Sequence, residues 1–312
     1  MLRSFRLPLS WSSLIRRTVK ESIDDNALGL AAELAYYFLL ALVPAIAFVA
    51  ALATFFPDAL IDQILANLSD FVPSDVLRIV QEQFDALASS RNGSVLTAGL
   101  LLALWSSSAA LVGITEALNR AYDIVEGRPW WKVRLTSMAL TFTLAALVLI
   151  AFALVMAGGA LAESLAMHLG FGMRFATAIK VLEWPLIFLL VVVAIGVVFY
   201  AAPDADQDWE WISPGAVVSA ALWLAASLVF KAFITRFPQY NATYGSLGGV
   251  IVLMLWFYIS GLSILIGAEM NSEIDHASPH AQLLPRQIGV RRTIGARAAR
   301  AVRPTIVRPE SP

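Results

Sequence analysis

The chain is predicted to be an all-α integral membrane protein with six transmembrane helices and both termini in the cytoplasm. This prediction follows from its composition, from the length of its apolar stretches and from the distribution of its basic residues. Hydrophobic residues make up 59% of the 312 residues and charged residues only 14%. The mean hydropathy is +0.72. A soluble globular protein typically carries more charge and less apolar sequence than this.

The apolar stretches have the length that a bilayer requires. An α-helix rises about 1.5 Å per residue, so about 20 apolar residues cross a hydrocarbon core about 30 Å thick. A soluble protein of this size could bury one or two such helices, but not six. The six stretches are residues 34–56, 94–114, 136–160, 181–202, 213–235 and 247–270.

The basic residues predict the orientation. Five Lys and Arg residues precede the first span, four lie between spans two and three, none lies between spans four and five, and seven follow span six. The alternate segments together hold five, and Lys231 lies within a span. Because cytoplasmic segments retain positive charge, both termini are expected inside. The chain then divides into a cytoplasmic segment (1–33), a membrane domain (34–275) and a basic cytoplasmic tail (276–312).

Amphipathic helices are expected outside the spans. Residues 11–25 predict one that lies on the cytoplasmic membrane surface or is solvated, and the external segment 57–93 predicts two short ones that lie over the bundle or along the headgroups. The tail is rich in proline and arginine, so we expect it to be disordered and attracted to anionic lipid headgroups. Nucleic-acid binding is disfavoured, because no aromatic residue or folded module accompanies the basic tail. In the N-terminal segment the apolar positions are Trp11, Leu14, Ile15, Val19 and Ile23.

Four blocks of sequence resemble the YihY/BrkB family of bacterial inner-membrane proteins. They are residues 104–135, residues 184–204 with the following SPGAVVSAALWLAASLVFKAFI, residues 240–274, and AYYFLLALVPAI in the first span. The resemblance implies six transmembrane helices with both ends cytoplasmic, and it carries over no catalytic residues. Members have been labelled ribonuclease BN, a label generally regarded as an error. An envelope transport role, with lipid among the suggested substrates, has been proposed for the family.

Charged and polar residues near the cytoplasmic ends of spans one, two and six form one candidate site. Four acids around one arginine predict either a structural clasp or a gate. The residues are Glu33, Glu116, Asn119, Arg120, Glu269 and Glu273.

The outer start of span six is the second candidate, for a substrate path. Glycines there permit an irregular helix start or close helix packing, and the aromatic and amide groups can bind a polar headgroup or form an interfacial belt. The residues are Tyr240, Asn241, Tyr244, Gly245, Gly248 and Gly249.

Two further features lie at membrane depth. Glu183 and Lys231 have matching depths in spans four and five, so they either form an ion pair or Lys231 extends to the outer headgroups. Pro44 lies in the middle of the first span, where it removes a backbone hydrogen bond and predicts a kink.

These features favour a transporter or a flippase-like protein for a lipid-like or amphipathic envelope component. The alternative is a structural or scaffolding protein of the envelope. An enzyme is not expected, because the chain lacks a P-loop, an H-E-x-x-H motif and a Gly-x-Ser-x-Gly motif. No cofactor or metal is expected either, since cysteine is absent and the three histidines lack ligand spacing. Assembly into a homo-oligomer, and the number of chains in it, are left open.

Reporter fusions test the predicted topology. A reporter that is active only in the cytoplasm should be active when it is fused after residue 275 or within 116–134, and inactive within 60–90. The reverse pattern of reporter activity would contradict the orientation derived from the basic residues.

Overall fold

The computed structural model describes residues 10–53, 93–169, 172–205, 212–236 and 246–277. Every regular element in this part of the chain is an α-helix, which agrees with the predicted fold class. The helices are α1 (Trp11–Asp24), α2 (Ala27–Ala53), α5 (Gly93–Ser107), α6 (Ala109–Ala121), α7 (Trp130–Leu169), α8 (Gly172–Ala201), α9 (Pro214–Arg236) and α11 (Ser246–Ala277).

Five stretches of the described chain are long and apolar enough to cross a membrane. The five are Ala27–Val49, Ala98–Ala121, Trp130–Leu154, Pro214–Ala232 and Gly248–Ala277. The fourth predicted span, residues 181–202 in α8, has a shorter apolar part at Pro185–Ala201. The chain is therefore a multi-pass membrane protein, and the span in α8 and the orientation remain predictions. The expected helices within 57–93 and almost all of the tail lie outside the described residues.

The helices run further than the apolar stretches predicted. The first begins at Ala27 rather than at residue 34, and the last continues to Ala277 rather than stopping at residue 270. Backbone hydrogen bonding continues through the polar residues at the end of an apolar stretch. A helix can therefore be longer than the apolar stretch that predicts it. Helix α2 begins at the same end of the bundle at which α6 and α11 terminate. We call this the inner end.

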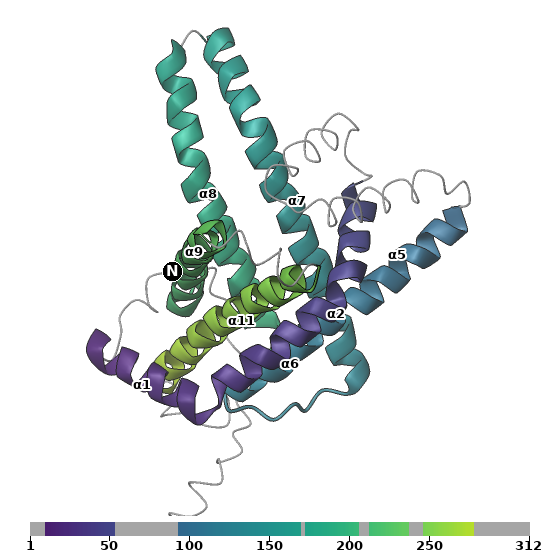
Figure 1. The fold of residues 1–312 in the computed structure, drawn as a ribbon, viewed down its shortest axis with the longest axis vertical. Helices are drawn as coiled ribbons and strands as arrows, with labels where there is room; N and C mark the ends of the chain where they lie inside the picture. Colours follow the sequence, from purple (N-terminus) through teal and green to yellow (C-terminus); the bar gives the residue numbers. More distant parts are fainter. Residues whose placement is uncertain (1–9, 54–92, 170–171, 206–211, 237–245, 278–312) are drawn as a thin grey trace, which may run out of the picture.

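Helices α7 and α8 form an antiparallel hairpin that extends beyond the other helices (Figure 1). At 1.5 Å per residue, the 40 residues of α7 span about 60 Å, roughly twice the thickness of a hydrocarbon core. The expected external connection 161–180 is mostly helical, because it forms the ends of α7 and α8. Its alanine and leucine residues favour helix.

Helix α11 lies at the centre of the packing and contacts α1, α2, α6 and α9. The buried core is built largely from small and branched side chains of these helices, among them Ala31, Leu34, Leu118, Leu265 and Ala268. Helix α2 changes direction part-way along its length (Figure 1), and Pro44 inside it provides the physical reason.

The backbones of α9 and α11 approach each other closely at two glycines. A Cβ at Gly215 would collide with the carbonyl oxygen of Gly267, and a Cβ at Gly267 would collide with the carbonyl oxygen of Gly215 and the hydroxyl of Ser219. Small residues at such a crossing bring the helices into van der Waals contact, which stabilises helix pairs in membranes.

Asn271 adds hydrogen bonds at the same crossing. Its Oδ1 accepts from the backbone N–H of Gly215 at 2.8 Å, and its Nδ2 donates to Ser213 Oγ at 2.9 Å. Ser213 Oγ also accepts from the N–H of Ala216 at 3.2 Å. These bonds satisfy N–H groups in the first turn of α9 that have no partner within the helix.

Alanine substitution of Gly267 should lower the free energy of unfolding by about 1–3 kcal/mol, the usual range for overpacking a close contact. The reason is the collision of the new methyl group with the backbone of α9. The measurement is the thermal melting of the purified protein in detergent. Gly249→Ala is the matched control, because a Cβ there meets nothing within 4 Å. Equal melting temperatures for the two variants would contradict the close crossing.

Candidate functional site

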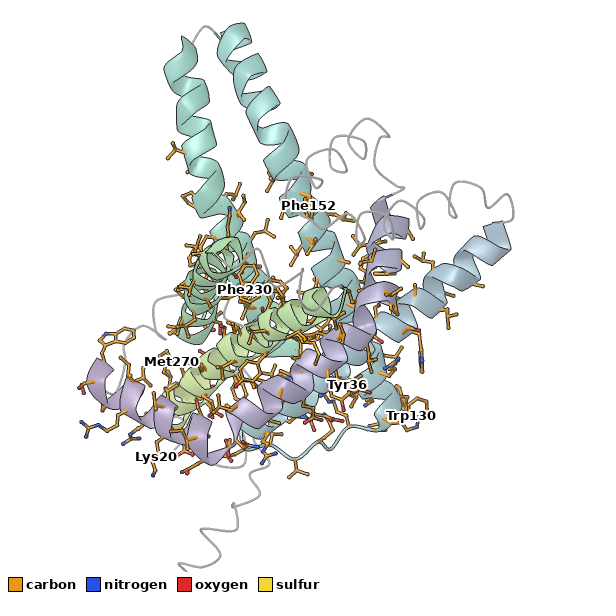
Figure 2. All side chains as sticks on the ribbon, viewed as in Figure 1. Lys20, Tyr36, Trp130, Phe152, Phe230 and Met270 are labelled. Carbon is orange, nitrogen blue, oxygen red and sulfur yellow. The ribbon has the colours of Figure 1, made fainter. Side chains whose placement is uncertain are left out.

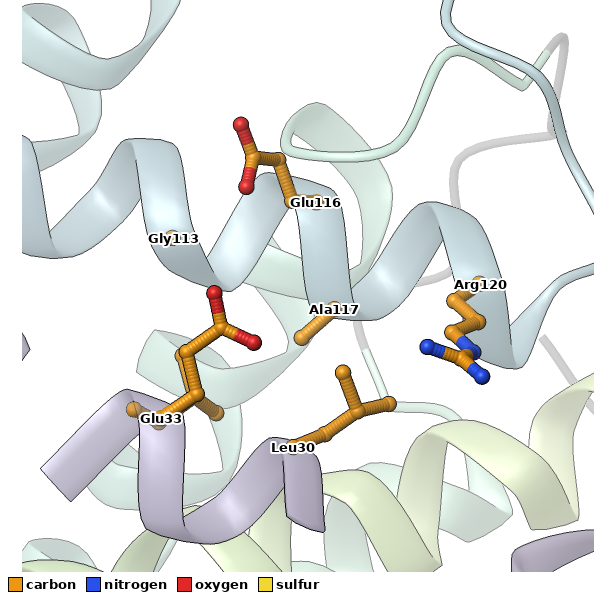
Figure 3. A pocket seen from close by; sticks show the side chains of 7 residues that line it. Leu30, Glu33, Gly113, Glu116, Ala117 and Arg120 are labelled. Atoms are coloured by element: carbon orange, nitrogen blue, oxygen red, sulfur yellow. The ribbon is translucent and has the colours of Figure 1, made fainter. Parts of the chain in front are cut away.

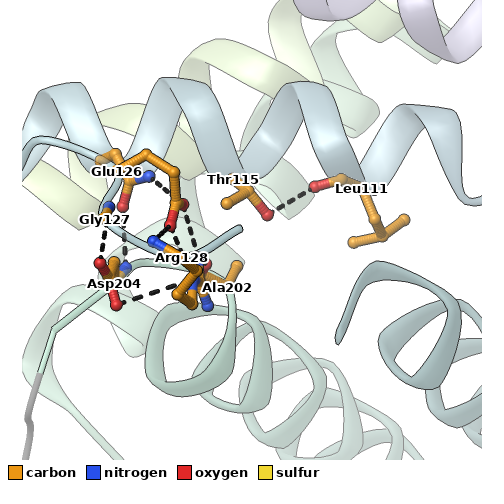
Figure 4. Close-up of polar contacts among 8 residues, drawn as sticks. Leu111, Thr115, Glu126, Gly127, Arg128, Ala202 and Asp204 are labelled. Carbon is orange, nitrogen blue, oxygen red and sulfur yellow. Dashed lines mark hydrogen bonds and ion pairs between the residues drawn. The ribbon is translucent and has the colours of Figure 1, made fainter. Parts of the chain in front are cut away.

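A polar network joins the α6–α7 connection to the end of α8 at the inner end (Figure 4). The Nε and Nη2 atoms of Arg128 donate to the two carboxylate oxygens of Glu126 at 2.9 and 2.8 Å. Nη2 of Arg128 also donates to the carbonyl oxygen of Ala202 at 2.8 Å, and so provides a partner beyond the last turn of α8. The guanidinium of Arg128 therefore links two segments that are far apart in the sequence.

Asn119 and Asp204 complete this network. Asn119 Nδ2 donates to Glu126 Oε2 at 2.9 Å, and Asn119 Oδ1 accepts from the backbone N–H of Asp204 at 2.9 Å. Asp204 Oδ2 accepts from the backbone N–H of Gly127 at 2.9 Å. Each member has its charge or polarity satisfied within the protein, so the network holds helices together rather than offering a ligand site.

The network also shifts the pKa values of its charged groups. Burial raises the pKa of the Glu126 carboxyl, but the hydrogen bonds from Arg128 and Asn119 outweigh this effect and hold the pKa below its ordinary value. The hydrogen bond to Glu126 raises the pKa of the Arg128 guanidinium. Both groups therefore remain charged at neutral pH, which keeps the ion pair intact.

A separate pocket of about 160 Å³ lies between α2 and α6 (Figure 3). Glu33 projects into it from α2, and Glu116 and Arg120 border it from α6. Its remaining lining residues are Leu30, Leu34, Gly113 and Ala117. The pocket thus combines two carboxylates and one guanidinium with an apolar floor.

The charges at this pocket do not neutralise one another directly. In the described part of the chain, no ion pair joins Arg120 to Glu33, Glu116 or any other carboxylate. Glu33 accepts a hydrogen bond from the Tyr37 hydroxyl at 3.2 Å. All three charged residues are exposed. Arg120 also interacts electrostatically with Asp25, which partly offsets the rise in the pKa of that carboxyl. The charge that remains at the pocket is open to water or to a charged ligand.

An apolar surface continues from the pocket along α2. Tyr36, Leu40 and Val43 follow Glu33 at three, seven and ten positions, a spacing that places all four on one side of the helix. The three are 53%, 58% and 51% exposed. The side of α2 that carries the Glu33 carboxylate at its inner end is therefore apolar further along.

Two acids that were predicted to cluster with Arg120 lie elsewhere at the inner end. Glu269 is 2% exposed, and the described residues provide it with no hydrogen bond or ion pair. Its electrostatic neighbours are the carboxylates of Asp25, Glu21, Asp123 and Glu273. These acids come from α1, the α1–α2 turn and the α6–α7 connection, and from α11 itself.

The acidic group is only partly compensated. Arg17 on α1 pairs with Glu273 at 3.7 Å. Burial, together with the nearby Asp123 and Glu21 carboxylates, raises the pKa of Asp25 from 3.8 to about 6. Because the pKa of Asp25 is higher in the folded state, its ionisation makes the protein less stable as the pH rises between these values.

The structure therefore divides the predicted charge cluster into three parts. Glu33, Glu116 and Arg120 share the pocket, Asn119 belongs to the Arg128 network, and Glu269 and Glu273 pack toward α1. The clasp around Arg120 is not formed by ion pairs, because the carboxylates near it lie beyond salt-bridge distance. Sequence reasoning missed Glu126, Arg128 and Asp204, whose only signal was charge in two short connections.

The structure describes only part of the second candidate site, the outer start of span six. Four of the six residues at the outer start of span six, Tyr240, Asn241, Tyr244 and Gly245, lie outside the described residues. Gly248 is buried, whereas Gly249 is exposed and faces open space, so the expected close helix packing is absent at Gly249.

The proposed pair in spans four and five also stays a prediction. Lys231 is exposed on α9, and the side chain of Glu183 lies outside the described ones. Within the described residues, no group of three or more His, Cys, Asp or Glu side chains has the arrangement of a metal site.

Comparisons with known proteins agree on one family. The family model for the virulence factor BrkB matches residues 18–287. The ribonuclease-like protein YfkH of Bacillus subtilis (strain 168) is 34% identical over 241 residues, which cover 77% of this chain and 87% of YfkH.

Membrane proteins of the UPF0761 group also match. The one from Aeromonas salmonicida (strain A449) is 31% identical over 263 residues, covering 80% of this chain and 84% of the relative. The one from Rhodospirillum centenum (strain ATCC 51521 / SW) is 28% identical over 264 residues, covering 84% of this chain but only 57% of that longer protein. No solved structure matches the chain.

Removal of the Arg128 guanidinium should destabilise the inner end. Arg128→Ala leaves Glu126 and the Ala202 carbonyl without their donor, and hydrogen bonds to charged groups contribute about 1.5–3 kcal/mol each. We expect a lower melting temperature in detergent at neutral pH. Lys132→Ala, at an exposed position nearby, is the control.

The stability lost in Arg128→Ala should depend on pH in a defined direction. The pKa of Glu126 is depressed in the folded state, so its contribution is present above its unfolded pKa and is lost as the pH falls through its folded pKa. The difference in melting temperature between the parent and Arg128→Ala should therefore narrow on acidification. A difference that widens would contradict the assignment.

Proposed function

Because this chain belongs to the virulence factor BrkB family of membrane proteins, we propose that it moves an amphipathic, lipid-like component of the cell envelope between the leaflets of the inner membrane. The observation that carries the proposal is the charged pocket between α2 and α6, which continues into the exposed apolar side of α2. A polar site beside a hydrocarbon-facing track suits a substrate with one polar and one apolar end.

The pocket chemistry favours a headgroup that carries both charges. The carboxylates of Glu33 and Glu116 can bind a cationic amine, and the guanidinium of Arg120 can bind a phosphate or carboxylate through paired N–H donors. A zwitterionic headgroup would compensate the charges that the protein leaves unpaired. Its acyl chains would lie along Tyr36, Leu40 and Val43.

The energy for directional movement would come from a gradient or from a partner, since the sequence contains no P-loop. Glu269 is the candidate for coupling to a gradient. Ionisable residues inside spanning helices are costly and commonly lie on ion or proton pathways, and Glu269 is a buried carboxylate without an ion-pair partner in the described chain.

A scaffolding role is the second candidate, and the α7–α8 hairpin favours it. The hairpin extends well beyond the other helices and offers a long surface to a partner in the envelope (Figure 1). Nuclease activity is not part of the proposal. The word ribonuclease-like belongs to the name of YfkH, and this chain lacks the nucleotide- and metal-binding motifs named above.

A reconstitution assay tests the transport proposal. The full chain is placed in liposomes that contain a phospholipid with a fluorescent acyl chain and a zwitterionic headgroup. The accessibility of that lipid to a membrane-impermeant quencher then reports its movement between leaflets. We expect faster movement than in empty liposomes. Arg120→Gln and the double variant Glu33→Gln/Glu116→Gln should each slow it roughly tenfold or more, because a charge-assisted contact contributes about 1.5–3 kcal/mol.

Two controls make the result interpretable. Lys132→Gln removes an exposed charge outside the pocket and should move lipid at the parental rate. Melting temperatures of the pocket variants should stay near that of the parent, since the three charged side chains are exposed. If all pocket variants move lipid at the parental rate, the pocket is not part of the lipid path. If the parental chain moves lipid no faster than empty liposomes do, the scaffolding role is favoured.

A further inference from the structure

Helix α1 exposes a row of large apolar side chains. Trp11, Ile15, Val19 and Ile23 are 55%, 53%, 53% and 70% exposed. They recur every four residues, so they share one side of the helix. In a helix surrounded by water this row would leave several large apolar groups solvated, and such a surface normally marks an interaction site.

A neighbouring side of α1 is fixed to the bundle. Leu14 is fully buried in a cluster with Met270 and Ile274 of α11. Arg17 of α1 pairs with Glu273 of α11 at 3.7 Å. These contacts set the rotation of α1 about its axis, so the exposed apolar row cannot turn into the protein without breaking them.

The position of α1 places this row at the membrane boundary. The helix lies across the inner end, beside the start of α2 and the end of α11 (Figure 1). Its 14 residues span about 21 Å, which is too short to cross a hydrocarbon core. Only Asp25 and Asn26 separate it from the first span, and the next exposed apolar residue, Leu28, already belongs to that span.

Two basic residues border the apolar row. Arg16 and Lys20 each follow a member of the row by one position, which places them about 100° further round the helix. Both are exposed, and Lys20 points away from the bundle (Figure 2). Basic side chains at the edge of an apolar side are typical of helices that lie in the plane of a bilayer interface and bind anionic lipids.

We propose that α1 is an interfacial helix that binds the anionic lipid surface of the leaflet at the inner end. Trp11, Ile15, Val19 and Ile23 enter the boundary between headgroups and acyl chains, while Arg16 and Lys20 contact anionic headgroups. Charge complementarity and continuity with the exposed Leu28 of the first span favour lipid over a second copy of the chain. This inference is independent of the proposed transport.

Single-cysteine spin labels test this placement in the full chain, which contains no cysteine to remove. Labels at Ile15→Cys and Val19→Cys are compared with one at Lys20→Cys, in liposomes of phosphatidylcholine with and without phosphatidylglycerol. All three positions are exposed, so the labels should leave the fold intact, and the melting temperature checks this. We expect the labels at 15 and 19 to collide mainly with oxygen, and the label at 20 to collide mainly with a water-soluble nickel chelate.

The role of the basic residues has its own test. In liposomes with phosphatidylglycerol, Arg16→Gln/Lys20→Gln should shift the label at 15 toward the nickel chelate, and in phosphatidylcholine alone it should have little effect. The proposal is overturned if the labels at 15 and 19 are accessible to the chelate in the parental chain. It is also overturned if they show dipolar broadening from a second copy, if both reagents are excluded because protein covers the row, or if anionic lipid makes no difference.

Discussion

The close crossing of α9 and α11 is the contact on which the rest of the bundle depends. Gly215 and Gly267 bring the two backbones together, and Asn271 closes the start of α9 with hydrogen bonds. Without these contacts α11 would lose its fixed position, and it is α11 that α1, α2 and α6 pack against. In a bilayer the apolar surfaces gain little from leaving lipid for protein, so such close packing supplies much of the association energy. The positions of Glu269 and of the buried Leu14 both follow from where this crossing holds α11.

The charged residues at the inner end form two groups, one with ion-pair partners among the described residues and one without. The guanidinium of Arg128 has a carboxylate and a carbonyl partner, and its network fixes the connections between helices. The pocket residues Glu33, Glu116 and Arg120 have no such ion-pair partners within the described chain. A protein that pairs one set of charges so fully leaves the other set available to something outside itself. This contrast supports a binding role for the pocket and a structural role for the network.

The fold class and the approximate positions of five spans could be predicted, because the length of an apolar run is read directly from the local sequence. The ends of the helices could not be predicted, because backbone hydrogen bonding continues beyond the apolar stretch. Membrane depth placed Glu33, Glu116 and Arg120 in one cluster, and all three line one pocket. Depth does not determine which side of a helix a residue occupies, however, and Glu269, expected in the same cluster, has the carboxylates of Asp25, Glu21, Asp123 and Glu273 as neighbours. The link between Arg128 and Asp204 was missed because it depends on the conformation of two short connections. The glycine crossing was also missed, although small residues four apart in α9 carried a signal.

The length of the α7–α8 hairpin determines how far the protein reaches from the inner end. Helix α7 begins two residues after Arg128, and α8 ends just before Ala202, whose carbonyl accepts from that arginine. Part of the hairpin is also packed into the bundle, because α7 contacts α2, α5 and α6, and α8 contacts α9. The 40 residues of α7 span about 60 Å, about twice the thickness of a hydrocarbon core. A hairpin anchored at the inner end therefore carries its far end past the opposite headgroups, where an envelope component outside the bilayer could contact it.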